Sequence, residues 1–147
     1  YEAMDEANEL VDDTVDTDIQ GYDIDGDIVK AARSNAQAAG VEHMIHFQQR
    51  LVNALSHPKK YGFLITNPPY GERLEDKESL PGLYRELGER FLALDSWSAY
   101  IISAYEDTEK YMGRKADKNR KIYNGMMKTY FYQFLGAKPP KRNRSRQ

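Results

Sequence analysis

Residues 61–71 read Tyr61-Gly62-Phe63-Leu64-Ile65-Thr66-Asn67-Pro68-Pro69-Tyr70-Gly71. The first half contains a continuous apolar run, which is typical of a parallel strand buried on both faces rather than of a strand with one face in water. The second half ends that strand, because two consecutive prolines lack backbone N–H donors and can continue neither a sheet nor a helix. The stretch therefore predicts a buried parallel strand over 61–66 that runs into a rigid loop.

Strand and helix patterns alternate on both sides of this stretch. Helices are expected at 1–14, 25–40, 79–95 and 106–112, and further strands at 19–24, 44–49, 97–104, 118–123 and 127–135. Asp25 is the expected N-cap of the second helix, and Asn124-Gly125 is a strong hairpin signal between the last two strands. The order predicts an α/β fold whose sheet is mostly parallel and ends in an antiparallel C-terminal hairpin.

Composition excludes several classes of protein. The 147 residues are 40% apolar and 30% charged, which suits a soluble domain with one core. No run approaches the roughly 18 apolar residues of a membrane span, so no membrane partner is expected. The chain has no cysteine and three scattered histidines, which excludes disulfides and thiolate sites and predicts no metal site. We expect a cytoplasmic protein.

Charge is distributed unevenly along the chain. Residues 1–27 hold eleven acids and no lysine or arginine, whereas the remaining 120 residues hold all 21 bases and 12 acids. The bases concentrate in 114–121 and in the tail 138–147, which we expect to be disordered. A phosphate backbone is a plausible partner for such clusters, and an ordinary solvated surface with a frayed terminus explains either of them equally well.

Two loops are expected at the carboxyl ends of strands, where parallel α/β sheets bind their ligands. They are Asp23-Ile24-Asp25 and Asn67-Pro68-Pro69-Tyr70. The second tetrapeptide should occur by chance in about one chain in a thousand of this length. The alternative interpretation is a turn packed under a tyrosine.

The tetrapeptide resembles the target-amine motif of S-adenosylmethionine-dependent amino-methyltransferases. Over about residues 18–136, the chain resembles the catalytic domain of the THUMP-containing large-subunit ribosomal RNA guanine-N2 methyltransferases. The motifs that carry the resemblance are Gly21-Tyr22-Asp23-Ile24-Asp25, Ile65 to Leu74, Leu83 to Gly88, Trp97-Ser98-Ala99-Tyr100 and Lys115 to Gly125.

The resemblance implies a Rossmann-like class I methyltransferase fold and methyl transfer to guanine N2. The Asn67 side-chain oxygen and the Pro68 carbonyl would accept the two N–H bonds of the target amine, as its developing positive charge requires. Pro68 and Pro69 would keep the loop stiff, and Tyr70 would stack on a base that has left its helix. The family likeness thus makes Asn67, Pro68, Pro69 and Tyr70 the expected catalytic residues.

The resemblance also implies S-adenosylmethionine as the cofactor. Asp23 would accept the ribose hydroxyls and Ile24 would pack on the adenine, with Asn67 also at the cofactor. An aspartate this close to a helix start is more often a cap, and we assign that role to Asp25 or Asp27. Many relatives carry an aspartate after the next strand to bind the adenine amine, and the matching residues 49–52 contain none.

Ribosomal RNA is the partner that the resemblance implies. The expected phosphate contacts are Arg73, Lys115, Lys118, Arg120, Lys121 and the basic tail. The alternative is that these are ordinary exposed bases, since lysine on an edge strand also discourages edge pairing. The aromatic residues at 130–134 are interpreted as sheet core rather than as base-stacking platforms.

The chain departs from the family in one respect. A first strand with a glycine-rich loop, which holds the methionine end of the cofactor, is absent before Gly21. In this fold that strand lies between those expected at 19–23 and 61–66. We therefore interpret 1–137 as the C-terminal portion of a catalytic domain, completed by an N-terminal part of the same polypeptide or by another chain.

Other functions stay open from the residues alone. The same pair of acceptors suits adenine N6 or a protein glutamine amide. A non-catalytic RNA-binding module is a rival of another class. A nicotinamide dehydrogenase would share the α/β layout and the acidic strand end, and it has no reason to contain Asn-Pro-Pro-Tyr.

Overall fold

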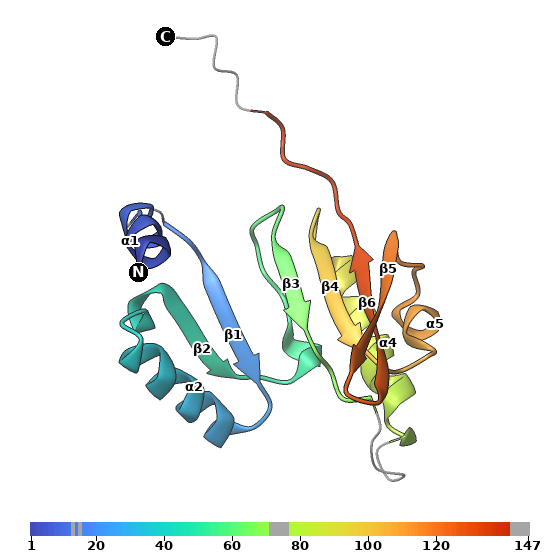
Figure 1. Ribbon diagram of the computed structural model, residues 1–147. Helices are drawn as coiled ribbons and strands as arrows, with labels where there is room; N and C mark the ends of the chain where they lie inside the picture. The colour runs from blue at the N-terminus through green and yellow to red at the C-terminus, as the bar shows by residue number, and fades with distance from the viewer. Residues whose placement is uncertain (13, 15, 71–76, 142–147) are drawn as a thin grey trace. The chain divides into compact units, whose positions relative to one another are not determined.

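The computed structural model describes residues 1–12, 14, 16–70 and 77–141 (Figure 1). The chain divides into two compact units, residues 1–51 and 52–147. The strands form two sheets, one in each unit. Each unit is described by itself below.

The first unit is a two-stranded parallel sheet with one packed helix. Strand β1 (Ile19–Asp23) pairs in parallel with β2 (Ile45–Gln49). Helix α2 (Gly26–Ala38) connects the two strands in the sequence and packs against both of them. Helix α1 (Glu2–Glu9) precedes them and has no buried residue, so the helix expected at 1–14 is confirmed in a shorter form. Val29 and Ala36, both on α2, are the buried apolar side chains of the described part of this unit.

The second unit is a four-stranded sheet in the order β3-β4-β6-β5. Strand β3 (Phe63–Thr66) is parallel to β4 (Ser98–Ser103), which is antiparallel to β6 (Met127–Phe134), and β6 pairs with β5 (Lys118–Asn124). The antiparallel C-terminal hairpin is therefore confirmed, and the sheet is mixed, with one parallel and two antiparallel pairings, where a mostly parallel sheet was expected. The hairpin loop is Gly125-Met126, one residue later than expected, and Gly125 supplies the positive φ of 64° that the turn needs.

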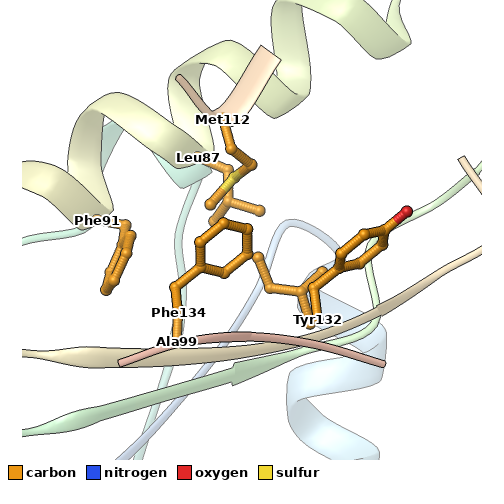
Figure 2. Packing of buried hydrophobic residues seen from close by; sticks show 7 residues of the cluster. Leu87, Phe91, Ala99, Met112, Tyr132 and Phe134 are labelled. Carbon is orange, nitrogen blue, oxygen red and sulfur yellow. The ribbon is translucent and has the colours of Figure 1, made fainter. Parts of the chain in front are cut away.

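Two helices cover one face of this sheet. Helix α4 (Leu80–Ala93) connects β3 to β4, and the short α5 (Thr108–Met112) follows β4 and packs against α4. Figure 2 shows their side chains facing the strands, with the Phe134 ring between Leu87 and Met112 of the helices and Ala99 of β4. The buried cluster is Leu87, Phe91, Ala99, Ile101, Met112, Tyr132 and Phe134. The aromatic residues expected to be sheet core thus include two of its members, Tyr132 and Phe134.

The other face of the same sheet exposes large apolar side chains. Phe63 and Ile65 are 67% and 79% exposed, so the expectation that this strand is buried on both faces is wrong. The physical reason is that α4 and α5 lie on the face of Leu64, which packs against the core, while Phe63 and Ile65 point to the other side. Tyr100 lies between Phe63 and Phe131 in an aromatic row, at ring-centroid distances of 6.2 and 6.0 Å.

Strands β1 and β3, which precede the two candidate loops, are both edge strands of their sheets. Strand β1 has β2 as its neighbour and β3 has β4, and no other described strand pairs with either of them. The described residues also include two short 3-10 helices, η1 (Glu42–Met44) and η2 (Val52–Ala54). No helix of the described residues has the length and apolar character needed to cross a membrane.

Candidate active site

The Asn-Pro-Pro-Tyr loop lies directly after β3, at the carboxyl end of that strand. Asn67 is exposed, Pro68 is buried, Pro69 is exposed and Tyr70 is half-buried. The strand stops here because neither proline can donate to a neighbouring strand. The loop therefore presents the Asn67 amide to solvent while the next residue is fixed in the protein.

A tyrosine of α4 is hydrogen-bonded to the backbone of this loop. The Tyr84 hydroxyl donates a hydrogen bond to the Pro69 carbonyl at 3.0 Å and shares another with the Ser103 hydroxyl at 2.6 Å. The Tyr84 side chain is fully buried. Burial raises the pKa of Tyr84 to about 12, with the Ser103 hydrogen bond opposing the shift and nearby tyrosines, Tyr70 among them, adding to it. The phenol is therefore neutral throughout the physiological range.

The second expected loop follows β1 and begins α2. The Asp25 side chain accepts from the Asp27 N–H at 2.9 Å and caps the helix, which confirms the cap assigned to Asp25. Asp23 is half-buried, and its Oδ1 accepts from the Asp25 N–H at 2.8 Å. A carboxylate offers about four acceptor positions, so this contact leaves Asp23 capable of further hydrogen bonds. Ile24 is 64% exposed beside it.

Gln49, at the end of β2, supports the same loop and was not singled out from the sequence. Its side-chain amide donates to the Ile24 carbonyl at 3.0 Å, and the backbone N–H of Arg50 donates to the Asp23 carbonyl at 2.9 Å. A Cβ at Gly26 would lie 2.8 Å from the Gln49 side-chain oxygen, so a larger residue there would displace the Gln49 amide from its present position. The residues that occupy the position of the expected aspartate thus buttress the β1–α2 loop.

The expected site residues fall into two groups. Asn67, Pro68, Pro69 and Tyr70 share one loop of the second unit, and Asp23 and Ile24 share one loop of the first. Each group stands at the carboxyl end of a strand that has a parallel neighbour. The described residues hold no cluster of three or more His, Cys, Asp or Glu side chains that could bind a metal ion.

Most of the expected phosphate-binding residues lie on or next to edge strand β5, whose residues are all exposed. Lys118 and Arg120 share the face of Gln133 and Phe131, and Lys121 points to the opposite face with Tyr130. Lys115 is exposed in the preceding loop, and Arg73 and residues 142–147 lie outside the described residues. Strand β5 therefore presents basic side chains on both faces of the sheet, Lys118 and Arg120 on one and Lys121 on the other.

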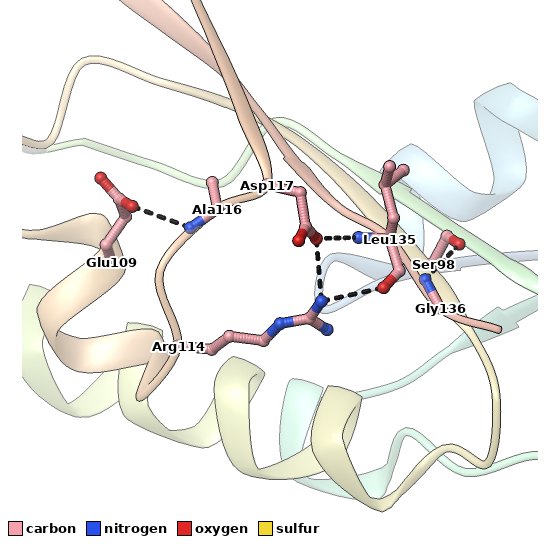
Figure 3. Close-up of polar contacts among 7 residues, drawn as sticks. All are labelled: Ser98, Glu109, Arg114, Ala116, Asp117, Leu135 and Gly136. Atoms are coloured by element: carbon pink, nitrogen blue, oxygen red, sulfur yellow. Dashed lines mark hydrogen bonds and ion pairs between the residues drawn. The ribbon is translucent and has the colours of Figure 1, made fainter.

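The loop that carries Lys115 is fixed by its neighbours (Figure 3). Arg114 bridges the Asp117 carboxylate and the Leu135 carbonyl, each at 2.8 Å, and the Leu135 N–H donates to Asp117 at 2.7 Å. The Ala116 N–H donates to Glu109 at 2.8 Å. The start of β5 is therefore tied both to α5 and to the end of β6.

Comparison with known proteins identifies the class. The chain is 42% identical to SMU.472, whose crystal structure is complexed with SAH, with a TM-score of 0.86 over 95% of this chain and 37% of that one. The fold is thus an α/β fold that matches class I methyltransferase domains. Residues 1–133 match the family described as RMKL-like, methyltransferase domain, and the chain belongs to that family.

Two relatives show how much of a whole protein this chain represents. YpsC of Bacillus subtilis (strain 168) is 40% identical over 123 residues, which cover 84% of this chain and 32% of the relative. Ribosomal RNA large subunit methyltransferase K/L of Legionella pneumophila (strain Corby) is 38% identical over 113 residues, covering 76% of this chain and 16% of the relative. The chain therefore spans a third or less of the curated relatives it matches.

Proposed function

We propose that this chain is part of an S-adenosylmethionine-dependent methyltransferase that methylates guanine N2 in large-subunit ribosomal RNA. The observation that carries the proposal is the Asn-Pro-Pro-Tyr loop at the carboxyl end of β3, with Asn67 exposed and the loop held by Tyr84. The relative from Legionella, which acts on large-subunit ribosomal RNA by its name, supports the choice of substrate.

The loop suits a planar amine that must lose conjugation to become a nucleophile. The Asn67 side-chain oxygen and the Pro68 carbonyl are the two acceptors for its N–H bonds, and they stabilise the positive charge that develops on the nitrogen. Tyr70 stacks on the base, and the fixed φ of both prolines limits how far these groups can drift apart. These residues therefore supply positioning and charge stabilisation without a strong base.

The loop after β1 suits the nucleoside part of the cofactor. Asp23 is a half-buried carboxylate that already accepts one backbone hydrogen bond, and its remaining acceptor positions fit two ribose hydroxyls. Ile24 is an exposed apolar side chain next to it, which suits the face of an adenine. S-adenosylmethionine supplies a methyl group bonded to a sulfonium centre. The SAH in SMU.472 supports this assignment.

We further propose that a segment outside these 147 residues, in the same polypeptide or a second chain, completes the fold. This segment supplies the first strand and the glycine-rich loop, and it covers the exposed face of the sheet. The unpaired edge of β3, the exposed Phe63 and Ile65, and the greater length of the relatives support this proposal.

The experiment measures methyl transfer by the polypeptide that carries these residues to unmodified large-subunit ribosomal RNA. Label from the cofactor should appear on guanine N2 after digestion to nucleosides, and Asn67→Ala should lower kcat by about 10²- to 10³-fold. The matched control is Asn35→Ala, on an exposed position of α2.

Three results would contradict the proposal in different ways. Label on adenine N6 or on a protein glutamine would show the alternative substrates. Full activity of Asn67→Ala would show that the Asn67 side chain is not needed for catalysis. Binding of RNA without any heat of S-adenosylmethionine binding in calorimetry would identify a non-catalytic RNA-binding module.

A further inference from the structure

We propose that Tyr84 is a positioning residue that fixes the Asn-Pro-Pro-Tyr loop through a directed chain of hydroxyl hydrogen bonds ending on the Pro69 carbonyl. This inference rests on the proposed function, because it states how the amine-binding groups of that site are held in place. Tyr84 lies on the buried side of α4, with Leu80, Leu87 and Phe91.

The chain of hydrogen bonds links three elements of the second unit. The Tyr105 N–H, which follows β4, donates to the Ser103 hydroxyl at 3.0 Å. Ser103, the last residue of β4, and Tyr84 of α4 share a hydrogen bond of 2.6 Å, and Tyr84 contacts the Pro69 carbonyl at 3.0 Å. Tyr84 and Ser103 are both 0% exposed, so water does not compete at either hydroxyl.

The direction of the chain follows from the donors available. The Pro69 carbonyl can only accept, so the single hydroxyl proton of Tyr84 is used there. The proton in the Ser103–Tyr84 contact therefore belongs to Ser103, whose oxygen in turn accepts from the Tyr105 N–H. Every member of the chain is satisfied in this one orientation, which polarises each hydrogen bond toward the loop.

The loop needs such a support because of its prolines. Pro68 and Pro69 have no backbone N–H, so at these two positions the backbone can be held only through its carbonyls. Each ring fixes φ, and ψ of Pro69 is the one soft dihedral between the carbonyls of Pro68 and Pro69. Holding the Pro69 carbonyl therefore restrains the Pro68 carbonyl, which is one of the two proposed amine acceptors.

The matched control is a second buried tyrosine of the same unit. Tyr132 is 3% exposed, and among the described residues no hydrogen bond links its hydroxyl to the Asn-Pro-Pro-Tyr loop. Tyr84→Phe and Tyr132→Phe remove the same atom from equally buried sites. A merely structural role of Tyr84 would make the two variants alike.

The first measurement reports on the Pro69 carbonyl directly and does not depend on enzymatic activity. Pro69-Tyr70 is the one Pro-Tyr pair in the sequence, so protein labelled with ¹³C at proline carbonyls and ¹⁵N at tyrosine gives a single proline-to-tyrosine cross-peak in an HNCO spectrum. Loss of the hydrogen bond in Tyr84→Phe should move its carbonyl resonance upfield, with a smaller shift in Ser103→Ala and none in Tyr132→Phe. An unmoved resonance in Tyr84→Phe, or a larger shift in Ser103→Ala, would overturn the inference.

The second measurement is steady-state kinetics with unmodified ribosomal RNA. Tyr84→Phe should lower kcat about tenfold, since a loop displaced by a fraction of an ångström misplaces the amine, while KM for S-adenosylmethionine stays unchanged. Tyr132→Phe should retain the parent kcat. A Tyr84→Phe enzyme with full kcat would refute the positioning role.

The two measurements together separate this inference from the proposed function. If Asn67→Ala keeps full activity, the proposed function fails whatever Tyr84 does. If Asn67→Ala is inactive while Tyr84→Phe is fully active, the function stands and the positioning role fails.

Discussion

The Tyr84 hydroxyl is the clearest case of one atom whose surroundings set its chemistry. Its pKa is raised from the ordinary value of 10 to about 12, because burial disfavours the phenolate more than the Ser103 hydrogen bond favours it. The unfolded chain therefore releases this proton at a lower pH than the folded chain does.

The consequence is a measurable dependence of stability on alkaline pH. The contribution of Tyr84 to the free energy of unfolding should be complete below pH 10 and should be lost as the pH rises toward about 12. We expect chemical denaturation to show a steeper loss over this range in the wild type than in Tyr84→Phe, where no proton can be released. Parallel curves for the two proteins would show that Tyr84 titrates normally.

Sequence patterns named the candidate site residues and did not reveal what holds them in place. The rarity of Asn-Pro-Pro-Tyr makes its loop a candidate, and the cap at Asp25 followed from its place before a helix. Tyr84 lies among the buried residues of α4, with Leu80, Leu87 and Phe91, and helical periodicity does not distinguish a tyrosine that only packs from one that also donates a hydrogen bond. A buried phenol needs a partner, and that requirement was the available signal.

The helix pair α4–α5 depends on one glycine. A Cβ at Gly88 would lie 2.3 Å from the Met112 carbonyl oxygen and 2.6 Å from the Met112 Cα, and these are backbone atoms that cannot turn aside. Gly88→Ala should therefore lower the free energy of unfolding by about 1–3 kcal/mol, the range for overpacking a core.

The same helix offers the control for this prediction. A Cβ at Gly82 would meet nothing within 4 Å. Gly82→Ala should raise the free energy of unfolding by about 0.5–1 kcal/mol, since alanine loses less backbone entropy than glycine in a helix. Urea denaturation measures both, and equal effects of the two variants would contradict the close approach of α4 and α5.

Strand β5 carries a prediction about RNA. Lys118 and Arg120 are exposed on one face of this edge strand, which suits contact with successive phosphates. If both bind phosphate, the double variant Lys118→Ala/Arg120→Ala should lower RNA affinity and reduce the slope of log K against log salt by about 1.4–1.8.

The control for β5 uses bases from helices. Lys30 of α2 and Lys110 of α5 are exposed, so Lys30→Ala/Lys110→Ala removes the same net charge elsewhere. A filter-binding titration at several salt concentrations distinguishes phosphate binding by β5 from a general effect of lost positive charge. An identical slope for both double variants would leave β5 with the ordinary role of a charged edge strand.

The elements were predictable where local signals agreed. Strands β1, β2 and β4 and the hairpin strands fall within two residues of their expected bounds, since alternation and turn residues act over short distances. The burial of β3 was mispredicted because the apolar run at 63–65 indicates only that its side chains are apolar, and it does not indicate which elements cover each face. That information lies in contacts with residues distant in the sequence, such as those of α4 and α5.

The two units should differ in local stability. The described part of the first unit buries two apolar side chains on α2, whereas the second has a core of seven buried residues from two helices and two strands. Amide hydrogen exchange should therefore be faster in β1 and β2 than in β4 and β6, because local opening costs less where less apolar surface is lost. Equal protection factors in the two sheets would contradict this.

The uncovered aromatic face of the β3-β4-β6-β5 sheet also has a calorimetric consequence. Unfolding exposes only the apolar area that folding had removed from water, and Phe63, Ile65 and their neighbours are already hydrated. The heat-capacity increment on unfolding of these 147 residues should therefore fall below the usual value of about 12–15 cal/mol/K per residue. A smaller increment reduces the curvature of the free energy of unfolding against temperature, so the stability of this chain should go on rising on cooling to a lower temperature than is usual for a domain of its size.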